Sequence, residues 1–326
     1  MRRLLRGVIG AIGVLVFSGC GTQGVGIATV VSTKLADGRP VFRFGFGAEG
    51  GAQPALVARS AGGFALVYVG TRPRDRHLYL STSPDGQTWL PAQRVADGEF
   101  SDQSPALLED EAGQLHLYFV SNRSGLNQAV YHATLTGHKA SEPVIVPGMS
   151  AAQRVAVARM GEEALVLAEV VGAGIVAYRG RPGGGLSALS SVAQAGAEPA
   201  VCALGDGRVA VAFQREGKII VRAGHPGVWG EEMVAADATT RLRDPALHAD
   251  AEGMVLAYAE RHGAGNMQLR LRAFDESFKF RTLEMPGIGS GESRGATFAV
   301  SPQGLRLLAW GMKTTDGQQG VMVTRH

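Results

Sequence analysis

A short motif recurs six times in this chain of 326 residues, and the repeat limits the possible folds more than any other feature. Each copy places a polar or charged residue before a short segment of small and apolar residues. The copies begin at Gln53, Ser104, Arg154, Glu198, Asp244 and Arg294. Successive copies lie 51, 50, 44, 46 and 50 residues apart. A nearly constant period of this length predicts six similar structural units.

Each repeat unit contains several apolar segments of strand length. After the motif comes a turn with Gly, Asp or Glu and then a second apolar segment, as in FALVYV at residues 64–69. A third segment follows, for example HLYLSTS at residues 77–83, and a weaker fourth one precedes the next motif. Four strands in a unit of about 45 residues are typical of a propeller blade. We therefore predict an all-β fold over residues 26–326, a six-bladed β-propeller of four-stranded antiparallel blades.

The last unit is too short to complete a blade by itself. It ends at His326, 32 residues after Arg294, and this leaves room for three strands. Residues 29–35 (TVVSTKL) and 40–46 (PVFRFGF) are both candidates for the missing strand. Pairing an N-terminal strand with the last unit would close the ring and remove an open sheet edge.

The first 19 residues have the features of an export signal. Three arginines precede an uncharged apolar run that is shorter than a membrane-spanning helix. The run ends in FSGC at residues 17–20, which resembles the lipobox of bacterial lipoproteins. The resemblance implies a signal peptide over residues 1–19, acylation of Cys20 and a short tether over residues 20–25. Gly21 in place of Asp after the cysteine implies the outer membrane, facing the periplasm or the cell surface.

Composition and charge exclude several classes of function. Removal of the signal peptide takes away Arg2, Arg3 and Arg6, so the formal charge of +3 becomes zero. No basic block remains that would suggest nucleic acid as a partner. Neither the eight histidines nor the two cysteines have metal-ligand spacing, and we expect no metal and no cofactor. With Cys20 lipidated, Cys202 has no disulfide partner, and we predict that it is buried and packs like a small apolar residue. We also expect the protein to be a monomer.

The heptapeptide SPDGQTW, residues 83–89, lies between the third and fourth predicted strands of the first unit. It resembles the Asp box of sialidase-type (BNR-repeat) propellers, with one residue fewer between Asp and Gly. A degenerate copy, HPGVW, occupies the same place in the fourth unit. Asp side chains accept backbone hydrogen bonds in turns, Gly adopts positive φ, and Trp packs between sheets. We therefore expect a structural role for the residues of this turn, Ser83, Asp85, Gly86, Thr88 and Trp89.

A candidate site follows from the repeat itself, because the first residues of the innermost strands meet at the mouth of the central channel. Residues predicted to bind a ligand there are Arg154, Arg243, Arg294, Gln53 and Gln103. Candidate catalytic carboxylates are Asp102, Glu198, Asp244 and Glu292. Arginines and carboxylates that converge on a concave surface can bind an acidic or hydroxyl-rich ligand. They can equally neutralise one another in a network of ion pairs, and the sequence leaves both interpretations open.

Resemblance to sialidases implies a triad of arginines for the substrate carboxylate, a tyrosine nucleophile assisted by Glu, and an Asp acid/base. Arg154, Arg243 and Arg294 could form the triad, but the last tyrosine is Tyr258 and the sixth unit has none to act as nucleophile. Turns of the SPDGQTW type also resemble those of arabinanase-type propellers, which need two or three carboxylates facing one sugar. Ser121 opens a segment, SNRSG, that resembles a strand-turn motif of TolB-type envelope propellers.

These observations predict a lipid-anchored propeller of the cell envelope that binds a glycan or a protein at its channel mouth without catalysis. One alternative is an exo-acting glycoside hydrolase that uses the channel-mouth carboxylates. A second is a TolB-like scaffold for envelope assembly. The fold by itself does not distinguish them, because propellers serve all three functions.

Overall fold

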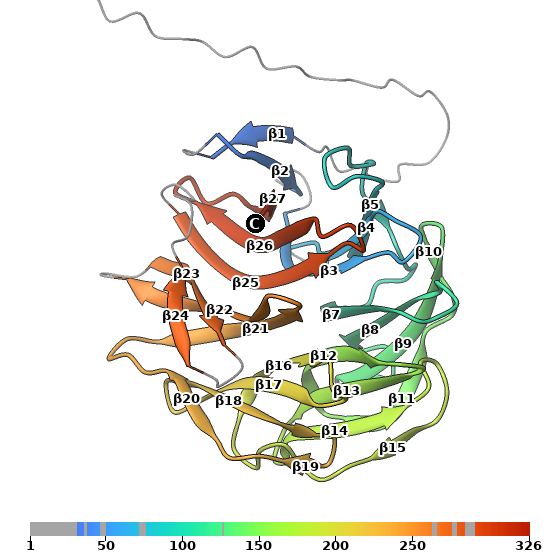
Figure 1. Ribbon diagram of the computed structural model, residues 1–326. Coiled ribbons are helices and arrows are strands. Elements are labelled where there is room, and N and C mark those ends of the chain that lie inside the picture. The colour runs from blue at the N-terminus through green and yellow to red at the C-terminus, as the bar shows by residue number, and fades with distance from the viewer. Residues whose placement is uncertain are drawn as a thin grey trace, which may run out of the picture.

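Six antiparallel β-sheets surround a central axis and follow one another in chain order (Figure 1). The computed structural model describes residues 31–35, 38–45, 50–71, 76–125, 127–262, 266–275, 279–283 and 291–326. The predicted signal peptide and tether, with Cys20, lie outside these residues and stay predictions. The sheets are the six blades of a propeller, as the repeat predicted. Within the described ranges no helix is long and apolar enough to cross a membrane.

Each blade is a meander whose first strand lies innermost. Blade 1 comprises β3 (Ala52–Ala58), β4 (Phe64–Val69), β5 (Leu78–Ser83) and β6 (Gln93–Arg94). Blade 2 comprises β7 (Asp102–Glu109), β8 (Leu115–Ser121), β9 (Ala129–Thr136), β10 (Lys139–Ala140) and β11 (Val144–Ser150). Blade 3 comprises β12 (Ala152–Met160), β13 (Glu163–Val170), β14 (Gly174–Gly180) and β15 (Leu186–Ala188).

The second half of the chain repeats this arrangement. Blade 4 comprises β16 (Ala197–Ala203), β17 (Val209–Arg215), β18 (Lys218–His225), β19 (Val228–Trp229) and β20 (Met233–Ala236). Blade 5 comprises β21 (Leu242–Asp250), β22 (Gly253–His262), β23 (Asn266–Phe274) and β24 (Phe280–Leu283). Blade 6 comprises β25 (Gly291–Val300), β26 (Arg306–Thr314), β27 (Gln319–Arg325), β2 (Pro40–Phe44) and β1 (Val31–Lys34). In blades 2 and 4 two strands share the fourth position, since β10 and β11 both pair with β9, and β19 and β20 both pair with β18.

Blade 6 joins the two ends of the chain. Its first three strands come from the C-terminal segment, and β2 pairs with β27 in an antiparallel register from Val41 opposite Thr324 to Phe44 opposite Val321. The prediction that an N-terminal strand closes the last blade is therefore confirmed. Both candidate segments take part, because β1 pairs in turn with β2 and forms a fifth, outermost strand. The inner strands β25 and β3 are in contact, so the ring is closed.

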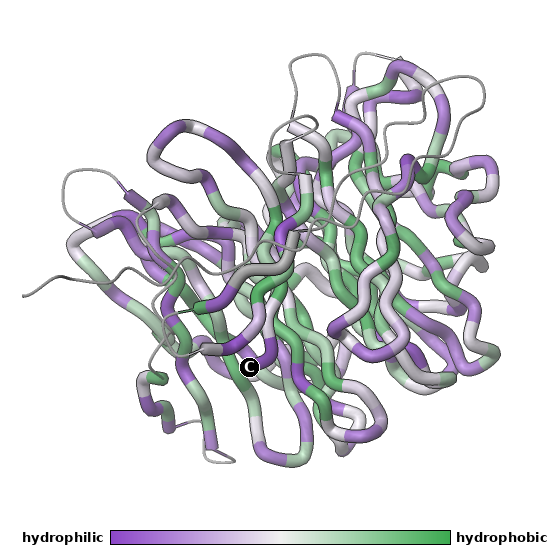
Figure 2. Tube along the Cα trace, turned by 90° about the horizontal axis from the view of Figure 1, so that it is seen from above, coloured by the Kyte–Doolittle hydropathy of each residue, from purple (hydrophilic) through white to green (hydrophobic). Residues whose placement is uncertain are grey.

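The core consists of layers between neighbouring blades. All six residues of β4 are buried, and their side chains point alternately to the two faces of the blade. Leu66 and Tyr68 belong to the layer shared with blade 6, whereas Ala65 and Val67 belong to the layer shared with blade 2. Because both faces of a second strand are covered, its sequence is a continuous apolar run rather than an alternating one. Figure 2 shows hydrophobic segments inside the blades and hydrophilic residues at the turns.

The SPDGQTW turn connects β5 to β6, and Asp85 organises it. Its Oδ1 atom accepts hydrogen bonds from the backbone N–H groups of Gln87 (2.7 Å) and Thr88 (2.6 Å), and Oδ2 accepts one from the Thr88 hydroxyl (3.0 Å). These bonds, led by the one from the Thr88 backbone, lower the pKa of Asp85. Gly86 has a φ of 69°, in the region that favours glycine. Trp89 is 8% exposed and packs edge-on against Phe44 of β2, with ring centroids 5.3 Å apart.

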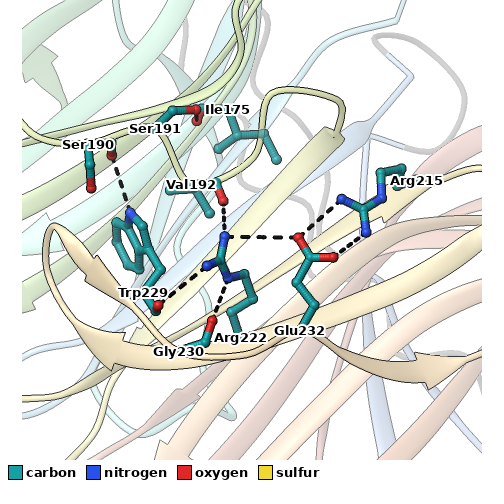
Figure 3. A network of polar contacts seen from close by, with 9 residues as sticks. All are labelled: Ile175, Ser190, Ser191, Val192, Arg215, Arg222, Trp229, Gly230 and Glu232. Carbon is teal, nitrogen blue, oxygen red and sulfur yellow. Dashed lines mark hydrogen bonds and ion pairs between the residues drawn. The ribbon is translucent and has the colours of Figure 1, made fainter.

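The degenerate copy of the turn, in blade 4, is held by contacts with blade 3 instead (Figure 3). Trp229 donates its indole N–H to the carbonyl of Ser190, at 3.2 Å. Arg222 of β18 donates to the carbonyls of Val192 (2.5 Å) and Trp229 (3.4 Å). In blade 4 a guanidinium therefore donates hydrogen bonds to backbone carbonyls around the turn, whereas in blade 1 a carboxylate accepts them from backbone N–H groups.

Candidate functional site

Every inner strand is irregular where the repeated motif begins. A register shift lies at this point in all six blades, for example between Ala52 and Ala55 in blade 1. Four motif residues that are not glycine have positive φ, namely Gln53 (49°), Ser104 (49°), Glu198 (56°) and Asp244 (49°). Such a conformation costs about 1–3 kcal/mol per residue, and it often occurs at ligand sites. Bulges of this kind also re-aim side chains, here around the central channel.

Side chains of the motif bridge neighbouring blades. Gln53 accepts a hydrogen bond from the backbone N–H of Ser104 (2.8 Å), and the Ser104 hydroxyl accepts one from the N–H of Val155 (3.1 Å). In the same way Glu198 accepts a bond from the N–H of Asp244, at 2.7 Å. The contacts to Ser104 and Asp244 satisfy backbone donors that the bulges leave out of the strand register. The motif therefore connects the inner ends of the blades.

A cavity of about 360 Å³ lies at the channel mouth over blades 6, 1 and 2 and extends to blades 3 and 5. Seven of the nine predicted site residues line it: Gln53, Gln103, Arg154, Arg243, Asp244, Glu292 and Arg294. Four polar residues that were not predicted join them: Thr71, Arg76, Lys313 and Gln319. Its volume is in the range of small-molecule sites.

Positive charge is in excess in this cavity. Five cationic side chains line it, those of Arg76, Arg154, Arg243, Arg294 and Lys313, against two carboxylates. Among the lining side chains the excess is three positive charges, five minus two, and it falls to two because Arg243 is paired with Glu198 just outside the cavity. Sequence reasoning missed Arg76 and Lys313 because it considered only the starts of inner strands. The ends of second strands meet the same face, and Lys313 near the end of β26 could have been found from that rule.

Both carboxylates of the cavity are close to arginines without tight pairing. Asp244 Oδ1 lies 3.9 Å from Arg154 Nη2, and Glu292 Oε1 lies 3.8 Å from Arg294 Nη1. These separations are longer than charge-assisted hydrogen bonds, which are about 2.7–2.9 Å. The Arg294 side chain is 51% exposed. Its guanidinium is therefore open to a ligand from the solvent.

The other two candidate carboxylates do not line this cavity. Glu198 is 8% exposed and both its oxygens have partners, since Oε1 accepts from Arg243 Nε (2.9 Å) and Oε2 from the Asp244 backbone. Burial, followed by the Asp244 charge, raises the pKa of Glu198. Asp102 is 1% exposed and pairs with Arg123 at 2.8 Å. Burial raises the pKa of Asp102 as well. Both groups are placed to hold the structure around the mouth.

The cavity lacks the aromatic group that sialidase chemistry requires. All six tyrosines of the chain are in described strands, and none lines the cavity. In the part of the chain that the structure describes, no three His, Cys, Asp or Glu side chains are grouped so that they could hold a metal ion. Cys202 is buried, as predicted, and burial raises the pKa of its thiol to about 12.

Solved structures similar to this chain are propellers of low sequence identity. A protein of unknown function from Dyadobacter fermentans has a TM-score of 0.69 at 13% identity, over 86% of this chain and 96% of that one. A Hadza microbial sialidase has a TM-score of 0.61 at 12% identity, over 85% of this chain and 66% of that one. Trypanosoma rangeli sialidase has a TM-score of 0.64 at 12% identity, over 91% of this chain and 57% of that one.

The chain therefore spans little more than half the length of the trypanosomal sialidase. At such identities the likeness shows a sialidase-like propeller fold and nothing about substrate or chemistry. No family model and no curated protein matches the sequence.

Proposed function

We propose that this propeller is a non-catalytic binding module for an acidic glycan, and that the cavity at its channel mouth is the binding site. The observation that carries the proposal is the excess of positive over negative side chains in a polar cavity of about 360 Å³, which remains after Arg243 is paired with Glu198. Guanidinium groups bind carboxylates through paired hydrogen bonds, and the loosely paired Arg294 and Arg154 have donors to offer.

The same geometry supports the proposed absence of catalysis. A retaining sialidase-type reaction needs a tyrosine at the sugar, and no tyrosine lines the cavity. A pair of carboxylates could act by the alternative glycosidase route, in which one protonates the leaving group and the other activates water or attacks. Asp244 and Glu292 are the two carboxylates in the cavity, and each lies close to an arginine, at 3.9 and 3.8 Å. We assign both to the charge network of the arginines rather than to catalysis.

The predicted lipid anchor at Cys20 would place this site at the cell envelope. An envelope protein with an acidic surface is the alternative partner, as a TolB-like scaffold would require. Neither the anchor nor the partner is part of the described structure, and both belong to the proposal.

Titration calorimetry with acidic and neutral sugars tests the proposal. N-acetylneuraminic acid and galacturonic acid should bind and galactose should not, and the affinity should fall as salt is added, because salt screens exposed charges. Replacement of Arg294 by Gln should weaken binding by about tenfold or more, the contribution expected of a charged hydrogen bond. Arg281→Gln, on the outer strand β24, is the matched control for loss of one charge.

Turnover assays separate binding from hydrolysis. Fluorogenic sialosides, glucuronides and arabinofuranosides should remain intact with the purified protein. Release of the fluorophore that disappears in Glu292→Gln or Asp244→Asn would establish the glycoside hydrolase instead. Equal affinity for galactose and galacturonic acid would contradict the role of the arginines.

A further inference from the structure

A second, smaller polar cavity lies beside the first at the same face of the propeller. Its volume is about 160 Å³, and it lies over blades 3, 4 and 5. It is lined by Gln153, Arg154, Glu169, Ala197, Glu198, Gln214, Arg241 and Arg243. Arg154 and Arg243 also line the first cavity, so the two cavities adjoin along this pair of arginines.

The carboxylates of the second cavity are already engaged within the protein. Glu169 accepts a hydrogen bond from the Glu198 backbone at 2.8 Å. Glu198 is occupied by Arg243 and by the backbone of Asp244. Glu198 therefore has a partner on each oxygen, and its ion pair offsets much of the charge of Arg243.

Three polar side chains of this cavity have no such engagement. Among the described residues no hydrogen bond or ion pair is found for the side chains of Arg241, Gln153 and Gln214. Arg241 and Gln153 are exposed, and Gln214 is partly buried. A guanidinium and two amides around one small concave surface provide donors for a carboxylate and partners for neighbouring hydroxyls. The same combination of groups surrounds the first cavity, with Gln53 and Gln103 as its amides.

We infer that the channel mouth binds an extended glycan with acidic groups on successive sugars, one in each cavity. Arg241 holds the second acidic group, and Arg154 and Arg243 lie beneath the bond that joins the two sugars. This inference rests on the proposed function and names its ligand class as an acidic oligosaccharide. A ligand that occupies both cavities can contact five arginines and Lys313, whereas a single sugar reaches only one cavity.

Galacturonic acid and its dimer and trimer are suitable probes, since they carry one, two and three carboxylates on the same sugar. Calorimetry should show binding to the trimer about tenfold to a hundredfold tighter than to the monomer, because a second charged hydrogen-bonded contact is added. Arg241→Gln should reduce this ratio of affinities to near one. Gln153→Glu should also reduce it, because it places a negative charge in the second cavity. Arg281→Gln, outside both cavities, should leave the ratio unchanged.

The outcomes separate this inference from the proposed function. Binding of monomer and trimer with equal affinity would overturn the second subsite and leave the acidic-sugar site intact. So would an Arg241→Gln variant that keeps the full ratio while circular dichroism shows the native fold. If neither monomer nor trimer binds, the proposed function fails, and the extended site fails with it.

Discussion

Single polar residues of this propeller act mainly by holding backbone groups that the strand ladders leave unpaired. Glu198 is an example, since it contacts the Arg243 guanidinium and accepts a hydrogen bond from the backbone of Asp244. Asp85 has the same kind of role at the outer end of blade 1. A carboxylate in such a position contributes stability through several short local bonds, without contact to a ligand.

Substitution of Asp85 by Ala should therefore lower stability and spare binding. Loss of bonds to the backbone of Gln87 and Thr88 should cost about 1 kcal/mol, as loss of a capping side chain does in helices. Asp85→Asn keeps one acceptor oxygen and should therefore lose less stability than Asp85→Ala. Urea denaturation measures the difference, and calorimetry with an acidic sugar shows whether the site is intact. Weaker binding by a stable Asp85→Ala variant would contradict a purely structural turn.

At the level of elements, the N-terminal strand β2 is the piece whose loss should matter most. It supplies Val41 and Phe44, both fully buried, to two different core layers. Phe44 contacts Trp89 of blade 1 and Tyr68 of β4, at centroid distances of 5.3 and 6.2 Å. The strand thus connects blade 6 to blade 1 through side chains as well as through its pairing with β27.

Phe44→Ala should destabilise the propeller by about 3–5 kcal/mol, the usual cost of removing a buried aromatic ring. The control is Phe280→Ala on β24, where the ring is 45% exposed and its loss leaves a smaller gap. Denaturation curves of the two variants give the comparison. A similar loss of stability in both variants would show that β2 does not stabilise the closure of the ring through Phe44.

The whole molecule should become less stable in mild acid, because partly buried histidines resist protonation in the folded state. Burial, followed by the charge of His116, lowers the pKa of His132 to about 4, and burial lowers that of His248. His132 Nε2 lies 2.9 Å from His116 Nδ1, and His116 Nε2 lies 3.1 Å from Asp110 Oδ2. The unfolded chain binds these protons at its ordinary pKa near 6.5, so stability is full above pH 6.5 and is lost as the pH falls toward 4.

Denaturation at pH 7 and pH 5 should show this loss, and it should be smaller in His132→Gln, whose side chain does not titrate. His262→Gln, exposed at the end of β22, is the control. The raised pKa values of Asp102 and Glu198 act in the opposite direction. The comparison is therefore between each variant and the unchanged protein, and an equal loss in His132→Gln would contradict the assignment.

Much of the architecture follows from the sequence alone. The period of the motif determined the number of blades, because each unit carries its own set of strand-forming segments. The 32 residues after Arg294 determined that the N-terminal segment must complete the last blade, and the pairing of β2 with β27 agrees. SPDGQTW predicted the turn between β5 and β6. These features depend on local pattern and on counting residues.

Only the tertiary structure decided which charged residues face the mouth. Asp102 immediately precedes Gln103 in the sequence, yet it is buried against Arg123 while Gln103 lines the cavity. Arg76 and Lys313 enter from segments outside the motif. Side-chain direction at a bulge depends on the local backbone turn, and the pairing of a charge depends on neighbours from other blades. Neither is encoded in the spacing of the repeat, so the sequence determined the ring and the packed blades determined the charge of its centre.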